Sequence, residues 1–156
     1  MDIGSGNGFP SSALSNFAPH SFVIDGVECA SMEGFLQSLK FSNPEMQKEV
    51  CRLVGKSAKF KGKKKKWWRT QTLFWQGKEI KRNSQEYQDL LDRAYDALAQ
   101  NTSFQKALIA TRGATLTHSV GKHKIEETVL TTQEFISRLN RIRAELLAHN
   151  KQEADK

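Results

Sequence analysis

The chain has 156 residues, of which 38% are hydrophobic and 26% charged, and its formal net charge is +7 at pH 7. This length and composition predict one soluble domain with a core of its own, and no apolar run approaches the length of a membrane span. The N-terminal residues lack the basic start and apolar stretch of a secretory signal. Cys29 and Cys51 are too few for a disulfide framework. We therefore expect a cytoplasmic protein with two reduced, buried cysteines and no zinc site.

The first third of the chain predicts a hairpin followed by two helices. β-prone segments flank Asp25-Gly26, a dipeptide typical of tight hairpin turns. Ser31 suits the N-cap of a helix in which apolar residues recur at helical spacing. The next helix is expected to begin at Asn43-Pro44 and to end at Gly55. Its inner face is expected to consist of Met46, Val50, Leu53 and Val54.

The remaining segments predict a second hairpin and three more helices. Gln76-Gly77 would form the hairpin turn, and helices are expected after Ser84 and after Asn101 or Thr102. The segment 113–124 contains two glycines, which predict a loop with at most a short strand.

Thr131 and Glu134 have the spacing of a capping box and open the last helix. The fold class is therefore mainly α (α+β), with a small β-hairpin near the N-terminus. We expect a single domain over residues 1–149 and a frayed polar tail over residues 150–156.

The charge excess is concentrated between residues 59 and 69, where six lysines accompany Trp67, Trp68 and Arg69. Lysines neutralise phosphates and aromatic rings stack on bases, so this segment is a candidate nucleic-acid contact. A solvated loop with one or both tryptophans anchored in the core explains the same residues equally well. The candidate contact residues are Lys63, Lys64, Lys65 and Lys66.

The helix expected over residues 31–41 carries a polar stripe beside its apolar face. At about 100° per residue, Glu33, Gln37 and Lys40 fall on one line, a pattern that lines clefts and is at least as common on plain surfaces. Glu33 lies in the first turn, where the helix dipole favours an ionised carboxylate, so we expect a base or electrostatic stabiliser rather than a proton donor. Gly34 costs about 0.5–1 kcal/mol relative to Ala in a helix. It indicates either a close approach to the backbone or neutral drift.

The segment 14–41 resembles the opening signature of the NADAR (YbiA-like) family. That signature couples a Ser-Asn-Phe loop, here Ser15–Phe17, to a short hairpin and to a helix with Glu, Gln and Lys at the intervals present here. The likeness continues through Trp68 and residues 101–111 into the C-terminal helix, and so covers almost the whole chain. It implies a compact, mostly helical YbiA-like fold with a pocket for ADP-ribose or a ribose phosphate, without metal or cofactor.

Members of that family are N-glycosidases. One branch cleaves a ribosylamino intermediate of riboflavin synthesis, and another removes ADP-ribose from guanine bases of DNA, reversing an ADP-ribosyltransferase toxin. With the basic charge balance, the resemblance favours the second branch, with ADP-ribosylated DNA as substrate and such a toxin as the paired partner. The alternatives are a hydrolase of a small ribosylamino-pyrimidine phosphate and a non-catalytic module that binds ADP-ribose or nucleic acid.

The resemblance also implies the site residues. Breaking the bond between ribose C1 and an exocyclic amine develops positive charge at C1 and the ring oxygen. The Glu33 carboxylate would either stabilise this charge or activate a water molecule. Lys40 would instead attack a ring-opened sugar as a neutral amine to form a Schiff base. The catalytic candidates are thus Glu33, ranked first, and Lys40. The substrate-binding candidates are Ser15, Asn16, Phe17, Gln37, Trp68, His118, Gly121 and Lys122.

The chain departs from the family pattern in two places. Gly34-Phe35 follows the signature Glu where a His or another polar residue is usual. The C-terminal loop reads THSVGKHK and lacks the usual acidic residue before Trp-Gly. The candidates to replace that element are His118, Lys122 and His123.

Overall fold

The structure is a computed structural model that describes residues 1–155. In chain order the elements are α1 (Ser11–Leu14), β1 (Phe22–Ile24), β2 (Val27–Cys29), α2 (Met32–Ser38), α3 (Pro44–Cys51), α4 (Gly55–Lys63), the 3-10 helix η1 (Trp67–Arg69), β3 (Thr72–Trp75), β4 (Lys78–Lys81), α5 (Gln85–Leu98), α6 (Thr102–Ala110) and α7 (Thr132–Ala154). The strands form two separate antiparallel hairpins, β1–β2 and β3–β4. This arrangement confirms the mainly α fold with small β elements.

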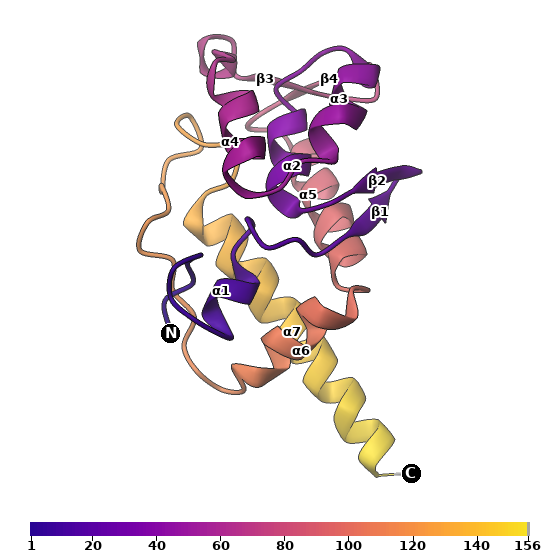
Figure 1. Cartoon of the computed structure of the whole chain (residues 1–156), viewed down its shortest axis with the longest axis vertical. Helices are drawn as coiled ribbons and strands as arrows, with labels where there is room; N and C mark the ends of the chain where they lie inside the picture. The colour runs from indigo at the N-terminus through magenta and orange to yellow at the C-terminus, as the bar shows by residue number, and fades with distance from the viewer. Residues whose placement is uncertain (156) are drawn as a thin grey trace.

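Figure 1 shows how these elements are arranged in space. Helices α2, α3 and α4 and the two hairpins form the upper part, α5 runs down from it, and α7 crosses the lower part diagonally. The chain between α6 and α7 passes as a long loop along one side and rises to the level of α4 before it enters α7. The apolar residues of both parts join in one core cluster.

The first hairpin and the start of α2 form as the sequence predicts. Asp25 and Gly26 both have positive φ, 48° and 78°, which suits a tight two-residue turn. Ser31 caps α2, because its hydroxyl accepts a hydrogen bond from the Gly34 amide at 3.0 Å. The cap therefore fixes where the polar stripe of α2 begins.

The end of the second predicted helix is wrong, because α3 stops at Cys51 and a separate helix begins at Gly55. The Cys51 carbonyl accepts the Ala30 amide at 2.8 Å and the Leu53 carbonyl accepts the Ser31 hydroxyl at 2.9 Å. These bonds to the β2–α2 junction turn the chain away from the α3 axis.

The inner face of α3 also differs from the prediction. Its buried residues are Gln47, Val50 and Cys51, whereas Leu53 and Val54 lie beyond the helix end. Both cysteines of the chain are buried and free. The lysine-rich segment that follows is helical as far as Lys63, so the alternative of a mobile loop is wrong for its first half.

Gly34 marks a close approach between α2 and the end of α3. A Cβ at this position would lie 2.6 Å from the Leu53 carbonyl oxygen and 3.0 Å from the carbonyl oxygens of Cys51 and Val50. Real Cβ atoms do not approach so closely, so only glycine lets the two helices pack here. The group that approaches the Gly34 backbone closely is therefore the backbone at the end of α3.

The later helices have the predicted caps and buried faces. Ser84 and Asn101 cap α5 and α6, and Thr131 forms a full capping box with Glu134 at the start of α7. Helix α7 continues as far as Ala154, within the polar segment predicted as a tail. Residue 156 lies outside the described residues.

Two negative findings hold for residues 1–155. No helix there is both long and apolar enough to traverse a lipid bilayer. No group of three His, Cys, Asp or Glu side chains is placed to share a metal ion.

Candidate functional site

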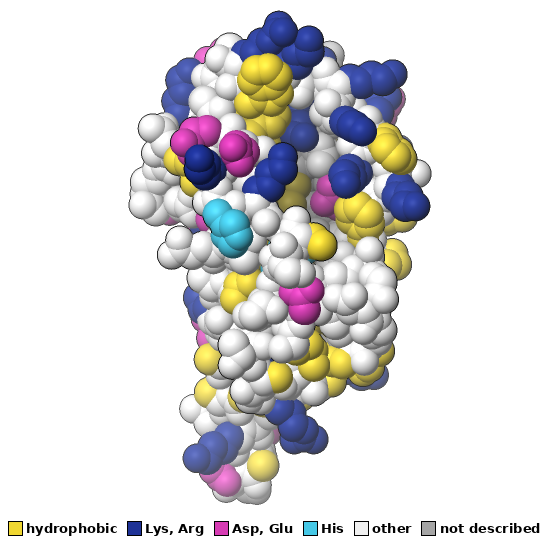
Figure 2. All heavy atoms as spheres, turned by 90° about the vertical axis from the view of Figure 1, so that its left-hand side faces the viewer, with side chains coloured by type: hydrophobic (Ala, Val, Ile, Leu, Met, Phe, Trp, Pro, Cys, Tyr) yellow, Lys and Arg dark blue, Asp and Glu magenta, His cyan; other side chains and the backbone are white. Residues whose placement is uncertain are grey.

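A cavity of about 580 Å³ opens between α2, α4, the Ser15–Phe17 loop and the loop before α7. All of the predicted catalytic and substrate-binding residues line it: Ser15, Asn16, Phe17, Glu33, Gln37, Lys40, Trp68, His118, Gly121 and Lys122. Of the four lysines predicted to contact nucleic acid, Lys63 and Lys65 line the cavity, and Lys64 and Lys66 lie outside its lining. Figure 2 shows Lys and Arg side chains gathered on the upper half of this face, with hydrophobic side chains among them.

The polar stripe of α2 forms one wall of the cavity. Glu33 and Gln37 lie one helical turn apart, and the Gln37 amide Nε2 donates to Glu33 Oε1 at 2.9 Å. Gln37 is only 7% exposed because α4 covers it at Gly62, where a Cβ would overlap Gln37 Oε1. The stripe is therefore a buried wall and not a solvated surface.

Burial changes the acid–base behaviour of Glu33. Loss of water around the carboxyl raises its pKa above the ordinary value, although the Gln37 hydrogen bond and the charges of Lys40 and Lys59 act in the opposite direction. Burial thus opposes the first-turn position, which favours the ionised form of Glu33. An ionised Glu33 is consequently a stronger base than an exposed carboxylate.

Lys40 is shifted toward its neutral form by the same cause. Burial lowers the pKa of its amine, the negative charge of Glu33 raises it, and the positive charge of Lys122 lowers it further. Burial outweighs the effect of the neighbouring carboxylate, which favours the charged form of Lys40. A neutral amine is what nucleophilic attack requires.

Asn16 is held in place by α5. Its Oδ1 accepts a hydrogen bond from the hydroxyl of the fully buried Tyr95 at 2.8 Å, and its backbone carbonyl accepts the Glu33 amide at 2.9 Å. No hydrogen bond to the Asn16 Nδ2 occurs within residues 1–155, which leaves that donor free to face a ligand. Ser15 stabilises the turn before Phe17, because its hydroxyl accepts a hydrogen bond from the Phe17 amide at 3.2 Å.

The two adjacent tryptophans take different places in η1. Trp67 is 8% exposed and belongs to the core cluster, whereas Trp68 is 52% exposed at the rim of the cavity. The guanidinium of Arg69 lies 5.6 Å from the centre of the Trp68 ring. One tryptophan thus anchors the segment and the other presents an open ring face beside the lysines.

Similarity to known proteins agrees with this arrangement. The family profile described as bacteriophage protein GP30.3 matches residues 8–144. An uncharacterized 17.1 kDa protein in the Gp30-rIII intergenic region of Enterobacteria phage T4 is 40% identical over 151 residues, which are 94% of this chain and 98% of the phage T4 protein. The chain belongs to the bacteriophage GP30.3 family.

A solved structure shows which fold this GP30.3-family chain has. The NMR structure of the E. coli protein YbiA is similar to it with a TM-score of 0.61, over 98% of this chain and 87% of that one, at 20% sequence identity. At this identity the likeness shows the fold and not the reaction. The YbiA-like fold expected from the sequence is therefore confirmed.

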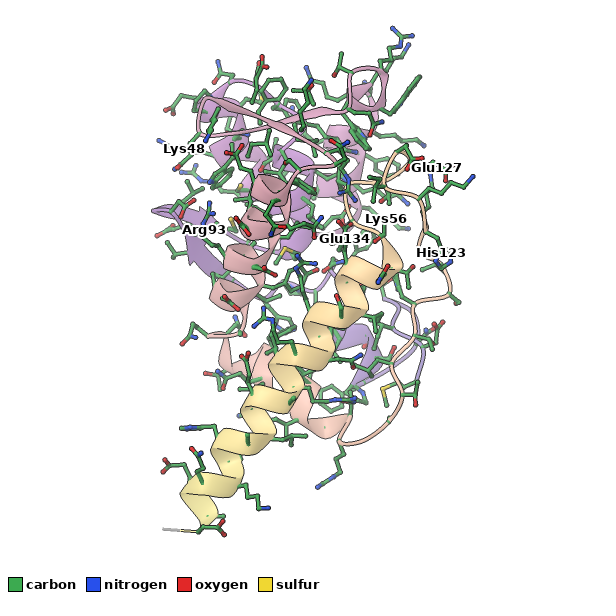
Figure 3. The ribbon with its side chains drawn as sticks, turned by 180° about the vertical axis from the view of Figure 1, so that it is seen from behind. Lys48, Lys56, Arg93, His123, Glu127 and Glu134 are labelled. Carbon is green, nitrogen blue, oxygen red and sulfur yellow. The ribbon has the colours of Figure 1, made fainter. Side chains whose placement is uncertain are left out.

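Sequence reasoning missed several cavity residues of this GP30.3-family chain. They are Gly4, Ser5, Leu36, Lys59, Trp67, Val120, Glu127, Thr128, Val129, Leu130 and Phe135. Lys59 belongs to the lysine-rich segment between residues 59 and 69, so it carried a signal in the sequence. Glu127 supplies an acidic group from the C-terminal loop, and Figure 3 shows it at the outer edge of that loop.

A buried ion pair fixes the loop that carries Glu127 and its neighbours. Arg82, fully buried after β4, donates to both carboxylate oxygens of Glu134 at 2.6 and 3.0 Å and to the Thr128 carbonyl at 2.8 Å. Its guanidinium also lies over the Tyr87 ring at 4.7 Å. Figure 3 shows Glu134 at the start of α7. The pair thereby ties one cavity wall to α5 and α7.

Proposed function

We propose that this protein is an N-glycosidase that removes ADP-ribose from guanine bases in DNA. The observation that carries the proposal is the placement of Glu33 and Lys40 in one cavity, where burial shifts the pKa of each toward its neutral form. Perturbed acid and base groups that share a cleft are typical of catalytic sites. The YbiA-like fold and the family resemblance of the α2 signature supply the reaction class.

The residues support two routes for cleavage. In one, the ionised Glu33 accepts a proton from water as the water oxygen bonds to ribose C1 and the bond from C1 to the guanine nitrogen breaks; the nitrogen keeps the electron pair, takes up a proton and leaves as the free guanine amine. In the other, the sugar ring opens to an imine, the neutral amine of Lys40 adds to C1 and the guanine amine leaves, and water then hydrolyses the resulting Schiff base and frees Lys40. Asn16, with its oxygen engaged by Tyr95, has its amide Nδ2 free to donate to the ribose hydroxyls or phosphates.

The rim of the cavity favours a nucleic-acid substrate over a free metabolite. Lys59, Lys63 and Lys65 line one side and Lys122 lines the other. Within residues 1–155, none of these amines forms an ion pair, so their charges are free to neutralise phosphates. The exposed ring of Trp68 adds a surface on which a base can stack. An ADP-ribosyltransferase toxin would be the source of the modified guanine.

The test is release of ADP-ribose from an oligonucleotide that carries ADP-ribosylated guanine. We expect release by the wild-type protein and a loss of about 10²–10⁴-fold in the Glu33→Gln variant, because a positioned acid–base group contributes this much. A matched control is Glu28→Gln, which removes an exposed carboxylate from the preceding hairpin.

Three other results would contradict the proposal. Turnover of only a small ribosylamino-pyrimidine phosphate would identify a metabolite hydrolase. Salt-sensitive DNA binding without turnover would identify a binding module. Equal release by wild type and Glu33→Gln would remove Glu33 from the reaction.

A further inference from the structure

The imidazole of His118 is held in one orientation with one nitrogen bound to the backbone. Its Nδ1 lies 2.7 Å from the Ile3 carbonyl oxygen. A carbonyl oxygen accepts, so Nδ1 carries a proton, and Nε2 is the nitrogen that gains and loses one. The ring also contacts Phe135 edge-on, with 5.1 Å between the ring centroids. The neutral imidazole of His118 therefore has its proton on Nδ1, and Nε2 is available to accept or donate a proton.

The segments on both sides of this hydrogen bond are fixed. Ile3 is fully buried, and its amide donates to the Thr117 carbonyl at 2.7 Å. The Asp2 carboxylate accepts the Ser119 amide at 2.8 Å, the Ser119 hydroxyl at 2.6 Å and the Thr117 hydroxyl at 3.0 Å. Asp2 therefore holds both chain neighbours of His118, and the ring cannot turn without breaking its own hydrogen bond to the Ile3 carbonyl.

The Cδ2–Nε2 edge of the ring lies beside Gly121. A Cβ at Gly121 would lie 2.6 Å from His118 Cδ2, the ring carbon bonded to Nε2, and would overlap Thr132 Oγ1. Only glycine leaves room for both side chains at this position, and His118 and Gly121 both line the cavity. Glu33 and Lys40 line the same cavity from α2, so His118 brings a third titratable group to it from a distant part of the chain.

We infer that His118 is the group that protonates the departing amine, an inference that rests on the proposed function. As the bond between ribose C1 and the guanine nitrogen breaks, its electron pair goes to nitrogen, which takes the proton from Nε2–H of the imidazolium. The water oxygen bonds to C1 and gives a proton to Glu33, and proton exchange with solvent restores both groups. An amine conjugated to a purine ring leaves poorly as an anion, so the reaction needs such a donor.

The matched variant is His118→Asn. The Asn amide can take the place of Nδ1–H against the Ile3 carbonyl, while it has no atom at the Nε2 position. We expect kcat/KM for ADP-ribosylated guanine DNA to fall about 10²–10³-fold. For an ADP-ribosyl nitrophenol of the same anomeric configuration we expect a change of less than about 5-fold, because nitrophenolate leaves without a proton.

The control is His149→Asn. His149 is exposed on α7 and lies outside the cavity lining. This variant should match the wild type on both substrates. If His118→Asn fails to fold, His118→Gln is measured in its place with the same two substrates, since it also lacks a titratable group.

The two substrates separate proton donation from a structural role. A loss of equal size on both, or wild-type rates on both, would overturn the assignment of His118. Absence of wild-type turnover on both substrates would overturn the proposed function itself, and the assignment with it.

Discussion

At the scale of single residues, burial decides the chemistry of Glu33 and Lys40 more than their positions on α2 do. A helix dipole contributes about 0.3–1 kcal/mol near the first turn, whereas loss of water shifts a buried group by up to several pKa units. The helical spacing of the sequence predicts that both residues lie on one stripe of α2. It does not predict that α4 packs over this stripe, because that contact is tertiary. For this reason the effect of burial on the Glu33 pKa could not be predicted from the sequence, whereas the position of Glu33 on the stripe could.

The Glu33 pKa makes activity depend on pH in a defined direction. If the ionised carboxylate is the base, activity is lost as pH falls through the folded-state pKa, and burial places that acid limb above the usual carboxyl range. The charge of Lys59 lowers the Glu33 pKa, so Lys59→Met should move the acid limb of kcat/KM to higher pH.

The matched control for this shift is Lys61→Met. Lys61 is exposed on the same helix and is absent from the cavity lining, and the charges that lower the Glu33 pKa are those of Lys40 and Lys59. Profiles of kcat/KM from about pH 4 to 9 would check the expectation, a span that covers carboxyl and histidine titration. An acid limb that stays in place or moves to lower pH in Lys59→Met would show that Glu33 does not set it.

At the scale of elements, the contact between α2 and α4 builds the cavity wall. Gly62 lies on α4 opposite Gln37, and a Cβ there would overlap Gln37 Oε1 and lie 2.8 Å from Gln37 Cδ. Gln37 Cβ would also be only 3.1 Å away, so a change in the amide torsion alone does not relieve the overlap. Either α4 or the whole Gln37 side chain must move, and the contact with Glu33 moves with it.

Gly62→Ala should therefore destabilise the fold although alanine favours helices. Overpacking of this kind costs about 1–3 kcal/mol, against a gain of about 0.5–1 kcal/mol in helix propensity. Urea unfolding would measure the difference. Gly113→Ala is the control, because a Cβ at Gly113 meets nothing within 4 Å. A Gly62→Ala variant as stable as the wild type would show that α4 is free to shift.

The elements that the sequence predicted well are those that carry their own boundary signals. The hairpin turns at Asp25-Gly26 and Gln76-Gly77 and the caps at Ser31 and Ser84 are local, so they are visible without tertiary context. Helix α4 has no side-chain cap and begins at a residue with positive φ, so nothing local marks its start. It is held by packing on α2, which is a tertiary effect.

At the scale of the whole molecule, the cavity joins segments that are distant in the chain. The stripe on α2 was predicted from spacing, and the family resemblance added His118, Gly121 and Lys122 to it. The groups that orient them come from elsewhere, namely Tyr95 of α5, Asp2 near the N-terminus and the buried Arg82. Such contacts have no sequence signal, because they follow from how the elements pack.

The charged side chains behind the net charge of +7 are unevenly distributed, because some lysines are paired with carboxylates and others are not. Lys48 pairs with Glu45 and Lys78 with Glu86, both away from the cavity. Within the described chain, by contrast, Lys63–Lys66 have no carboxylate partner. A cluster of uncompensated positive charge therefore lies where α4 and η1 border the cavity, and a polyanion should be attracted to this side.

Salt dependence of DNA binding tests whether this local charge or the net charge matters. The two variants to compare each replace four lysines by glutamine. One changes Lys63, Lys64, Lys65 and Lys66, and the control changes Lys48, Lys78, Lys106 and Lys151. Both lower the net charge by the same amount, and none of the control residues lines the cavity.

For a single-stranded oligonucleotide, each lysine that neutralises a phosphate contributes about 0.7 to the slope of log Kobs against log salt concentration. The Lys63–Lys66 variant should therefore lose about 1–3 units of slope, and the control variant should keep the wild-type slope. Fluorescence anisotropy over a salt titration measures both. Equal slopes in the two variants would mean that binding follows the net charge, because the lysines beside the cavity would then contact no more phosphates than those elsewhere.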